Sequence, residues 1–128
     1  MSPEEVDRLA GQLFAAIEAA DVDAVAALYD DDVAVWHNTS QHAQTKQENL
    51  ALLKGLTSRA EAWRYEDVRR RCYPGGCSQQ HVLRGKLQGA EPFEIPVCIV
   101  LEMSEGKICR IDEYLDSAAV AALFPARS

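Results

Sequence analysis

The sequence predicts an α+β fold in which one sheet packs against helices on one of its faces. Apolar residues recur at helical spacing in the first part of the chain and again after Thr45. From about residue 59 onward the pattern alternates with a period of two, and short glycine- or proline-containing turns separate the segments. Because short turns join antiparallel neighbours, these segments are expected to form one mostly antiparallel sheet.

The first helix is marked by its N-terminal capping pattern. Ser2 precedes Pro3 and is followed three residues later by Glu5, which is typical of a capping box. The residues expected to form its buried face are Val6, Leu9, Leu13, Phe14 and Ile17.

A short second helix and the first strand follow. Asp21 is expected to cap a helix over residues 22–29. The three adjacent aspartates at residues 30–32 repel one another, so they are expected to end this helix in a solvated turn. The β-branched and aromatic segment at residues 33–38 predicts a strand.

A third helix and four further strands complete the predicted fold. Thr45 and Glu48 form a second capping box, and the buried stripe of that helix comprises Leu50, Leu53 and Leu56. The predicted strands cover residues 59–72, 78–87, 93–103 and 108–115. Asp116 is expected to cap a C-terminal helix that carries Ala118, Val120, Leu123 and Phe124.

Size and charge restrict the possible partners. A length of 128 residues is typical of one domain, so residues 1–128 are expected to fold as a unit. The formal charge of -7 disfavours phosphate backbones, so no nucleic acid is expected as a partner. No apolar run is long enough to span a membrane, and the acidic N-terminus lacks signal-peptide features. We therefore expect a cytoplasmic protein with no membrane partner.

The four cysteines are Cys72, Cys77, Cys98 and Cys109. None has the short paired spacing of a zinc site, so neither a metal nor another cofactor is expected. Cys72 and Cys77 flank a turn and could face each other across a hairpin, which would permit a disulfide. A reducing cytosol argues against that bridge, and the sequence leaves the question open.

Three stretches carry a resemblance to a known superfamily. The segment DVDAVAALYDDDV at residues 21–33, the hairpin around Gly75 and Gly76, and the segment GKICRIDEYLD at residues 106–116 occur in a similar order in the SnoaL-like branch of the nuclear transport factor 2-like superfamily. This superfamily includes the ketosteroid isomerase-like, cystatin-like cone folds. The resemblance implies a cone-shaped fold, in which a bent, mostly antiparallel sheet wraps around helices and a central apolar pocket.

The catalytic residues of the ketosteroid isomerases are mostly absent. His37 stands where their carboxylate base ends the first strand. Leu13 and Cys98 stand at their two oxyanion-hole positions, and neither side chain supplies the short donor hydrogen bond of that site. The usual ketosteroid isomerase mechanism is therefore not expected.

The limonene epoxide hydrolases give a partial match. Glu113 corresponds to the aspartate of their last strand, whereas Leu83 and Gly85 replace the arginine and the second aspartate. The scytalone dehydratases offer a looser analogy, because they combine two histidines with carboxylates in the same kind of pocket.

The resemblance implies that His37 and Glu113 point into one pocket, and strand alternation places His81 on the face of its hairpin that could join them. His37 would be the base, because histidine titrates near neutral pH, with Glu113 as its orienting partner and His81 as a second donor. The alternatives are a strand-end His37 hydrogen-bonded to Asn38 or to the polar loop, and a solvent-facing His81. For Glu113 the alternative is an edge-strand charge paired with Arg84 or Arg110. The resemblance also implies that a ligand contacts Leu13, Ile17, Val35, Leu53, Cys98 and Ile111.

Two functions from different classes remain. The first is cofactor-free acid–base chemistry, namely dehydration, isomerisation or hydrolysis, on a small and largely apolar carbonyl or hydroxyl compound of polyketide-, steroid- or terpenoid-like character. The second is a non-catalytic ligand-binding or dimerisation module. A pocket that holds paired histidine and glutamate favours the enzyme, and a pocket closed by apolar side chains favours the module.

A homodimer is also expected. The strand at residues 93–103 is apolar on both faces, so the face away from the helices needs cover, and Ile99 and Leu101 are expected in the interface. The aromatic side chains at strand spacing are interpreted as core or interface residues: Trp36, Trp63 and Tyr65.

Overall fold

The computed structural model describes residues 1–121. Its helices are α1 (Pro3–Glu18), α2 (Val22–Leu28), α3 (Lys46–Arg59) and α4 (Ser117–Val120). Its strands are β1 (Tyr29–His37), β2 (Ala43–Gln44), β3 (Ala60–Tyr73), β4 (Gly76–Leu87), β5 (Phe93–Ser104) and β6 (Lys107–Leu115). Leu123 and Phe124, predicted to belong to the last helix, lie outside the described residues. No helix within residues 1–121 is both long and apolar enough to cross a membrane.

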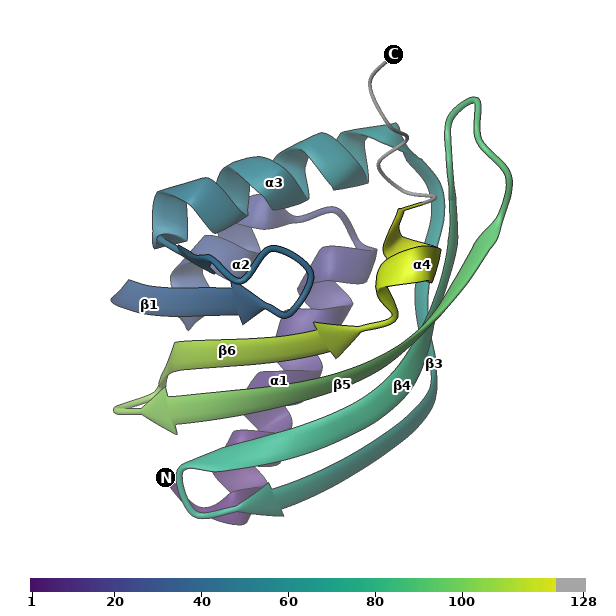
Figure 1. Ribbon diagram of the computed structural model, residues 1–128. Helices are drawn as coiled ribbons and strands as arrows, with labels where there is room; N and C mark the ends of the chain where they lie inside the picture. The colour runs from purple at the N-terminus through teal and green to yellow at the C-terminus, as the bar shows by residue number, and fades with distance from the viewer. Residues whose placement is uncertain (122–128) are drawn as a thin grey trace.

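The six strands form one curved sheet in the order β2-β1-β6-β5-β4-β3. Neighbouring strands are antiparallel, except that β1 and β6 run parallel. Figure 1 shows the long strands β3, β4 and β5 bending around the helices, with α1 behind the sheet and α3 above it. This bent, mostly antiparallel sheet around helices confirms the predicted fold class.

The helices begin where their capping residues predict. The Ser2 hydroxyl accepts a hydrogen bond from the Glu5 amide at 3.2 Å, and the Glu5 carboxylate accepts one from the Ser2 amide at 3.2 Å. Thr45 and Glu48 form the same reciprocal pair at the start of α3. These bonds satisfy amide groups that a helix terminus leaves without partners. The side chains that cap α2 and α4 are Asp21 and Asp116.

The first strand begins earlier than predicted. β1 starts at Tyr29 and includes residues 30–32, which were expected in a turn. The register with β6 shifts between Tyr29 and Ala34, so the three aspartates bulge out of the ladder. Lys46 Nζ donates to the Tyr29 carbonyl at 3.2 Å and to the Asp31 carboxylate at 3.1 Å. The bulge keeps the aspartates near solvent without ending the strand.

Strand β5 is apolar on both faces, and the structure shows which face is buried. The residues that point toward the helices are nearly inaccessible, namely Ile95, Val97, Ile99 and Leu101. The expectation that Ile99 and Leu101 lie in a dimer interface is therefore wrong, because both belong to the core of a single chain. The opposite face carries Pro96, Cys98 and Val100.

Gly85 marks a point where three strands leave no room for a side chain. It pairs with Trp63 of β3 on one side and with Phe93 of β5 on the other. The two aromatic rings meet edge to face, with centroids 5.8 Å apart. A Cβ atom at Gly85 would lie 2.5 Å from the Ala62 carbonyl oxygen and 2.7 Å from Phe93 Cζ.

We predict that Gly85→Ala lowers the free energy of unfolding by about 1–3 kcal/mol, because the added methyl group meets a backbone oxygen that cannot move aside. Gly55→Ala is the control. Gly55 is exposed within α3 and has no atom within 4 Å of an added Cβ, so this change should stabilise the protein by about 0.5–1 kcal/mol. Urea denaturation measures both effects. A Gly85→Ala variant with an unchanged free energy of unfolding would contradict the proposed crowding between β3 and β5.

Candidate functional site

A cavity of about 490 Å³ lies between the inner face of the sheet and helices α1 and α3. Its walls are mostly leucine, isoleucine and aromatic side chains, with a smaller set of polar groups. Such a volume is typical of sites for small molecules. Five of the six predicted ligand contacts line the cavity: Leu13, Ile17, Val35, Leu53 and Ile111.

The sixth predicted contact, Cys98, lies on the other side of the sheet. Ile99 pairs with Glu113 in the antiparallel register and lines the cavity, whereas Cys98 pairs with Tyr114 on the outer face. Successive residues of a strand point to opposite faces, so an offset of one residue exchanges the inner and outer sets. The prediction that Cys98 contacts the ligand is corrected for this reason.

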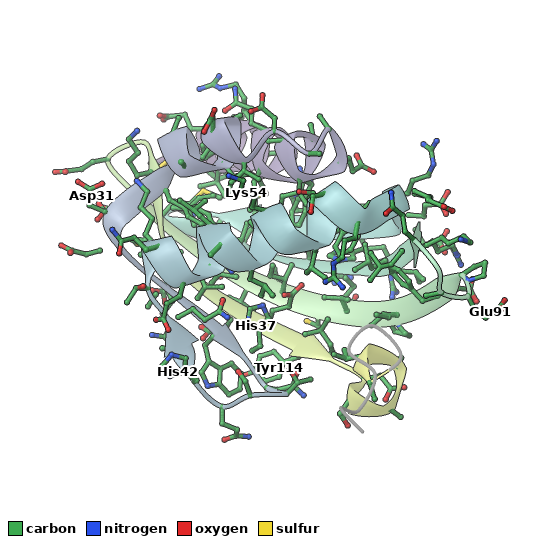
Figure 2. The ribbon with its side chains drawn as sticks, turned by 90° about the horizontal axis from the view of Figure 1, so that it is seen from above. Asp31, His37, His42, Lys54, Glu91 and Tyr114 are labelled. Carbon is green, nitrogen blue, oxygen red and sulfur yellow. The ribbon has the colours of Figure 1, made fainter. Side chains whose placement is uncertain are left out.

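His37 and Glu113 meet at the cavity wall. The parallel register of β1 and β6 makes them direct partners, so both side chains leave the same face of the sheet. His37 Nε2 lies 2.9 Å from Glu113 Oε1, and the side chains are 16% and 19% exposed. Figure 2 shows His37 on the side of the sheet that faces α3. The sequence therefore predicted this pair of neighbours correctly.

Asn38 secures the end of the two strands beside the pair. Its backbone amide donates to the Glu113 carbonyl at 3.1 Å. Its side-chain oxygen accepts from the Leu115 amide at 2.8 Å, and its side-chain nitrogen donates to the Leu115 carbonyl at 3.1 Å. The side chain thus continues the ladder beyond the last residue of β1. The pairing of His37 with Glu113 is held by backbone and side-chain bonds together.

The contact with Glu113 decides which ring nitrogen of His37 is free. His37 Nε2 and Glu113 Oε1 are in ion-pair contact, and a neutral ring that carries its proton on Nε2 has its lone pair on Nδ1. Among the residues that the structure describes, none forms a hydrogen bond with Nδ1. Nδ1 is then the ring nitrogen left to accept a hydrogen bond from another molecule.

His81 does not line the cavity with His37 and Glu113. Its ring packs edge to face against Phe14 and Tyr65, with centroid distances of 5.6 Å and 5.0 Å. Those two aromatic side chains do line the cavity, and His81 lies behind them. The prediction that one pocket holds all three residues is met only for His37 and Glu113.

A chain of hydrogen bonds connects His81 to the surface. The guanidinium group of Arg70 donates to the Asp7 carboxylate at 2.8 Å and to Gln79 Oε1 at 2.8 Å. Gln79 Nε2 lies 2.8 Å from His81 Nδ1. Gln79 is 1% exposed and His81 is 3% exposed, so both are held inside the protein.

This chain of hydrogen bonds determines the tautomer of His81. Arginine only donates hydrogen bonds, so Gln79 must present its oxygen to Arg70 and its amide nitrogen to His81. His81 Nδ1 is then an acceptor, and the ring proton lies on Nε2. Within the described residues, Nε2 is buried and has no partner. A buried N–H without an acceptor costs about 1–3 kcal/mol. The unpaired Nε2–H of His81 is therefore an unusual feature of this core.

The cavity wall also carries a polar row that was not predicted from the sequence. It comprises Tyr29, Asn49 and Gln44. The Tyr29 hydroxyl donates to Asn49 Oδ1 at 2.8 Å, and Asn49 Nδ2 donates to Gln44 Oε1 at 3.0 Å. Burial and the nearby Glu113 carboxylate raise the pKa of Tyr29 above its ordinary value. A signal existed for Asn49, because it shares helical spacing with the apolar Leu53 and therefore occupies a core position.

Trp63 and Tyr65 also line the cavity, although they were interpreted as core or interface residues. Residues separated by two positions share one face of a strand, and the Trp63 indole N–H donates to the Tyr65 hydroxyl at 3.1 Å. Trp36 lies on the outer face, where its ring packs edge to face on Tyr114. The aromatic side chains of β3 thus belong to the cavity.

Metal-binding side chains do not cluster. Among residues 1–121, no group of three or more histidine, cysteine, aspartate or glutamate side chains is arranged to hold a metal ion. The polar groups of the cavity are a histidine, one carboxylate, two phenols, an indole, amides and hydroxyl groups. These groups suit proton transfer and hydrogen bonding.

We predict that the His81 ring is neutral at pH 7 and carries its proton on Nε2. Ring ¹⁵N chemical shifts of the labelled protein measure this directly. In Gln79→Glu, both oxygens of the new carboxylate accept hydrogen bonds, so His81 Nδ1 should gain a proton. A wild-type ring with its proton on Nδ1 would contradict the proposed hydrogen-bond chain.

The pH dependence of the free energy of unfolding provides a second test of the buried, neutral His81 ring. Burial is the largest cause that lowers the pKa of His81 below its ordinary value. Below pH about 6.5 the unfolded chain therefore binds a proton that the folded ring does not, and stability falls as the pH falls. His81→Leu should remove this part of the slope. An unchanged slope would assign it to other groups.

Comparison with known proteins agrees with this architecture. The profile of the SnoaL-like domain family matches residues 10–111. No curated protein shows a significant match to the chain. AusH from Aspergillus nidulans is similar in fold, with a TM-score of 0.80 at 18% identity over 99% of both chains.

Two other solved structures are similar. An LEH-like epoxide hydrolase from M. tuberculosis has a TM-score of 0.79 at 19% identity, over 97% of this chain and 98% of that chain. A protein with a ketosteroid isomerase-like fold from Catenulispora acidiphila, in complex with trimethylamine, has a TM-score of 0.78 at 17% identity, over 95% of this chain and 92% of that chain. At these identities the likeness shows the fold alone.

The family profile spans both the helices and the strands that enclose the cavity. The matched segment includes His37 and ends before Glu113. The curved sheet, the helices inside it and the solved structures of similar fold agree with the resemblance that the sequence carries. The chain belongs to the SnoaL-like domain family, within the nuclear transport factor 2-like fold.

Proposed function

We propose that this protein is a cofactor-free enzyme that transfers a proton on a small, largely apolar carbonyl or hydroxyl compound. The observation that carries the proposal is the pair of His37 and Glu113, 2.9 Å apart on the wall of a cavity of about 490 Å³. A histidine held by a carboxylate and open to a pocket is a common arrangement for a general base. The apolar walls favour a polyketide-, steroid- or terpenoid-like ligand.

In the proposed mechanism, His37 Nδ1 removes a proton from the ligand. Glu113 remains bound to Nε2–H, keeps the ring in one orientation and faces the positive charge that the ring gains. The same nitrogen then returns the proton, either to another carbon in an isomerisation or to a departing hydroxyl group in a dehydration. If His37 instead takes the proton from water, the hydroxide bonds to a ligand carbon, the bond from that carbon to its leaving oxygen breaks, and His37 returns the proton to that oxygen in a hydrolysis. We favour dehydration or isomerisation, because they need only proton transfer and placed dipoles.

Asn49 and Gln44 are the proposed donors to the ligand oxygen. Asn49 uses one amide hydrogen to bind Gln44, which leaves its second hydrogen free. Gln44 also lines the cavity with its amide group. Such donors stabilise the negative charge that develops on a carbonyl oxygen when a neighbouring proton leaves. His81 is proposed to act indirectly, by holding the rings of Phe14 and Tyr65 from behind.

The alternative is a non-catalytic binding module. It is supported by Leu13, which lines the cavity where the ketosteroid isomerases place an oxyanion-hole tyrosine. A cavity of this size and polarity also suits binding without chemistry. The two functions differ in turnover, so a single set of variants separates them.

We predict that the wild-type protein catalyses hydrogen–deuterium exchange next to the carbonyl of small cyclic ketones, or dehydration of small β-hydroxy ketones. His37→Gln should lower kcat/KM by roughly 10²- to 10⁴-fold, the usual contribution of a positioned base. Glu113→Gln should give a smaller loss, because the ring keeps a hydrogen-bond partner without a charge. NMR measures the exchange, and ultraviolet absorbance follows the dehydration.

His42 and Glu48 provide the matched control. They form the same type of pair at 3.4 Å, but their side chains are 60% and 50% exposed and neither lines the cavity. His42→Gln and Glu48→Gln should leave activity unchanged. Ligands that raise the melting temperature without any turnover above the buffer rate would establish the binding module instead.

We also propose that the protein is a homodimer that uses the outer face of the sheet. A broad hollow of about 950 Å³ crosses β3 to β6 on that face. Its rim carries both Asp67 and Arg69, so the surface offers both charges to a second copy related by a two-fold axis. Tyr114 is 49% exposed there, and Figure 2 shows it on the side of the sheet away from α3. The apolar residues of the hollow include Val68, Val82, Pro96, Cys98 and Tyr114.

We predict a dimer in sedimentation velocity at tens of micromolar, a range set by ordinary interface affinities of about 1 μM. Tyr114→Glu should shift the protein to monomer, because it places a charge inside the interface. Tyr73→Glu is the control, since Tyr73 is 45% exposed but lies outside the hollow. A wild-type monomer, or equal effects of the two variants, would contradict this interface.

A further inference from the structure

We propose that Cys72 and Cys77 form a thiol–disulfide site at the end of the β3–β4 hairpin. The two cysteines are direct partners in the antiparallel register, one pair beyond Tyr73 and Gly76, which close the turn. Both thiols are free in this structure. The site does not overlap the cavity, so the inference is independent of the proposed enzyme activity.

The hairpin geometry brings the two side chains together. In an antiparallel ladder, hydrogen-bonded and non-hydrogen-bonded pairs alternate, so the pair next to the turn-closing pair is of the non-hydrogen-bonded kind. Such partners have Cα atoms about 4.5 Å apart, which lies inside the range of about 4.4–6.8 Å for disulfides. The two thiols are close enough that each contributes to the shifted pKa of the other.

Contacts from two other segments hold the turn in place. The Gly75 amide donates to the Met1 carbonyl at 3.1 Å, and the Met103 amide donates to the Gly75 carbonyl at 2.8 Å. Gly75 has a φ of 81°, a conformation that glycine adopts without strain. Figure 1 shows the N-terminus beside this hairpin. A fixed turn keeps the two thiols facing each other, which favours a bond between them over bonds to separate molecules.

The two thiols differ in access. Cys77 is fully buried, whereas Cys72 is partly exposed and its thiol lies 3.8 Å from the Asp7 carboxylate of α1. An external disulfide therefore reaches Cys72 first. The charged and titratable groups around Cys72 are Asp7 of α1, Arg70 of β3 and Cys77 of β4.

The reaction proceeds by two exchange steps with a low-molecular-weight disulfide such as oxidised glutathione. The Cys72 thiolate attacks one sulfur of the reagent, which releases one glutathione thiolate and leaves a mixed disulfide. The Cys77 thiolate then attacks Cys72 Sγ and releases the second glutathione thiolate. The protein loses two electrons and two protons, and the reagent is reduced to two thiols.

Oxidation of Cys72 also changes a contact of the hydrogen-bond chain that ends at His81. The Cys72 thiol donates to Asp7, which is the same carboxylate that anchors Arg70. Forming the disulfide removes the proton that Cys72 shares with Asp7. The redox state of the hairpin is thereby connected to the outer end of the chain through Arg70 and Gln79.

The test is oxidation of the full chain in mixtures of reduced and oxidised glutathione at pH 8, followed by acid quenching, alkylation and tryptic peptide mapping. Cys72 and Cys77 fall in one tryptic peptide, residues 72–84, whereas Cys98 and Cys109 fall in two others, residues 87–107 and 108–110. We expect the 72–84 peptide to lose two hydrogen atoms and to take up no alkylating agent. Reduced glutathione should restore both alkylation sites.

Two variants make the outcome decisive. In Cys77→Ser the first step remains and the second is impossible, so Cys72 should stop at the mixed disulfide with glutathione. Cys72→Ser should leave the buried Cys77 unmodified. Burial raises the pKa of both thiols, so the wild-type rate should rise by up to roughly tenfold per pH unit between pH 7 and 8.

Two results would overturn the proposal. One is a wild-type 72–84 peptide that carries glutathione or remains fully alkylated under conditions that modify Cys98 or Cys109. The other is a disulfide that links two chains through Cys72. The activity of the cavity enters neither result, so a failure of the proposed enzyme function would be seen separately.

Discussion

The parallel pairing of β1 with β6 is the constraint on which the candidate site depends. Every other neighbouring pair of strands is antiparallel and consecutive in sequence. β1 reaches β6 from the opposite end of the sequence, and the register sets His37 against Glu113. The bulge before Ala34 absorbs the extra residues of β1, and Asn38 closes the ladder after His37. A shift of one residue in this register would send one of the two side chains to the outer face.

Because the sheet is curved, its two faces have different surroundings. The inner face encloses the helices and the cavity, and the outer face carries Trp36 and Tyr114 in contact with each other. The cavity is lined mostly by leucine, isoleucine and aromatic side chains, and its polar lining residues include His37, Glu113 and the Tyr29–Asn49–Gln44 row. The ligand that we propose is therefore apolar over most of its surface and carries a carbonyl or hydroxyl oxygen.

Local signals allowed much of this fold to be predicted. Ser2, Thr45 and Asp116 cap helices where their neighbours in the sequence indicate, because capping involves residues only a few positions apart. The inward side of β5 could not be predicted in the same way. Both of its faces are apolar, so the pattern does not distinguish Ile99 from Cys98. For the same reason, the dimer interface was predicted at Ile99 and Leu101, which belong to the buried face.

Polar residues inside the protein were the hardest to predict, because their partners are distant in sequence. Gln79 and His81 look like solvated strand residues until Arg70 and α1 are placed against them. Tyr29 and Asn49 likewise meet across 20 positions of the chain. Residues paired by a family resemblance, such as His37 with Glu113, were an exception, since the resemblance supplied the missing register.

The central claim is that His37, held by Glu113, faces a ligand from the wall of the cavity. A crystal structure of the protein soaked with a library of small ketones and alcohols tests it most directly. We expect a bound molecule inside the cavity, with an atom within hydrogen-bond distance of His37 Nδ1 while Nε2 remains beside Glu113. A His37 ring turned into bulk solvent, or ligands bound only on the outer face of the sheet, would contradict it.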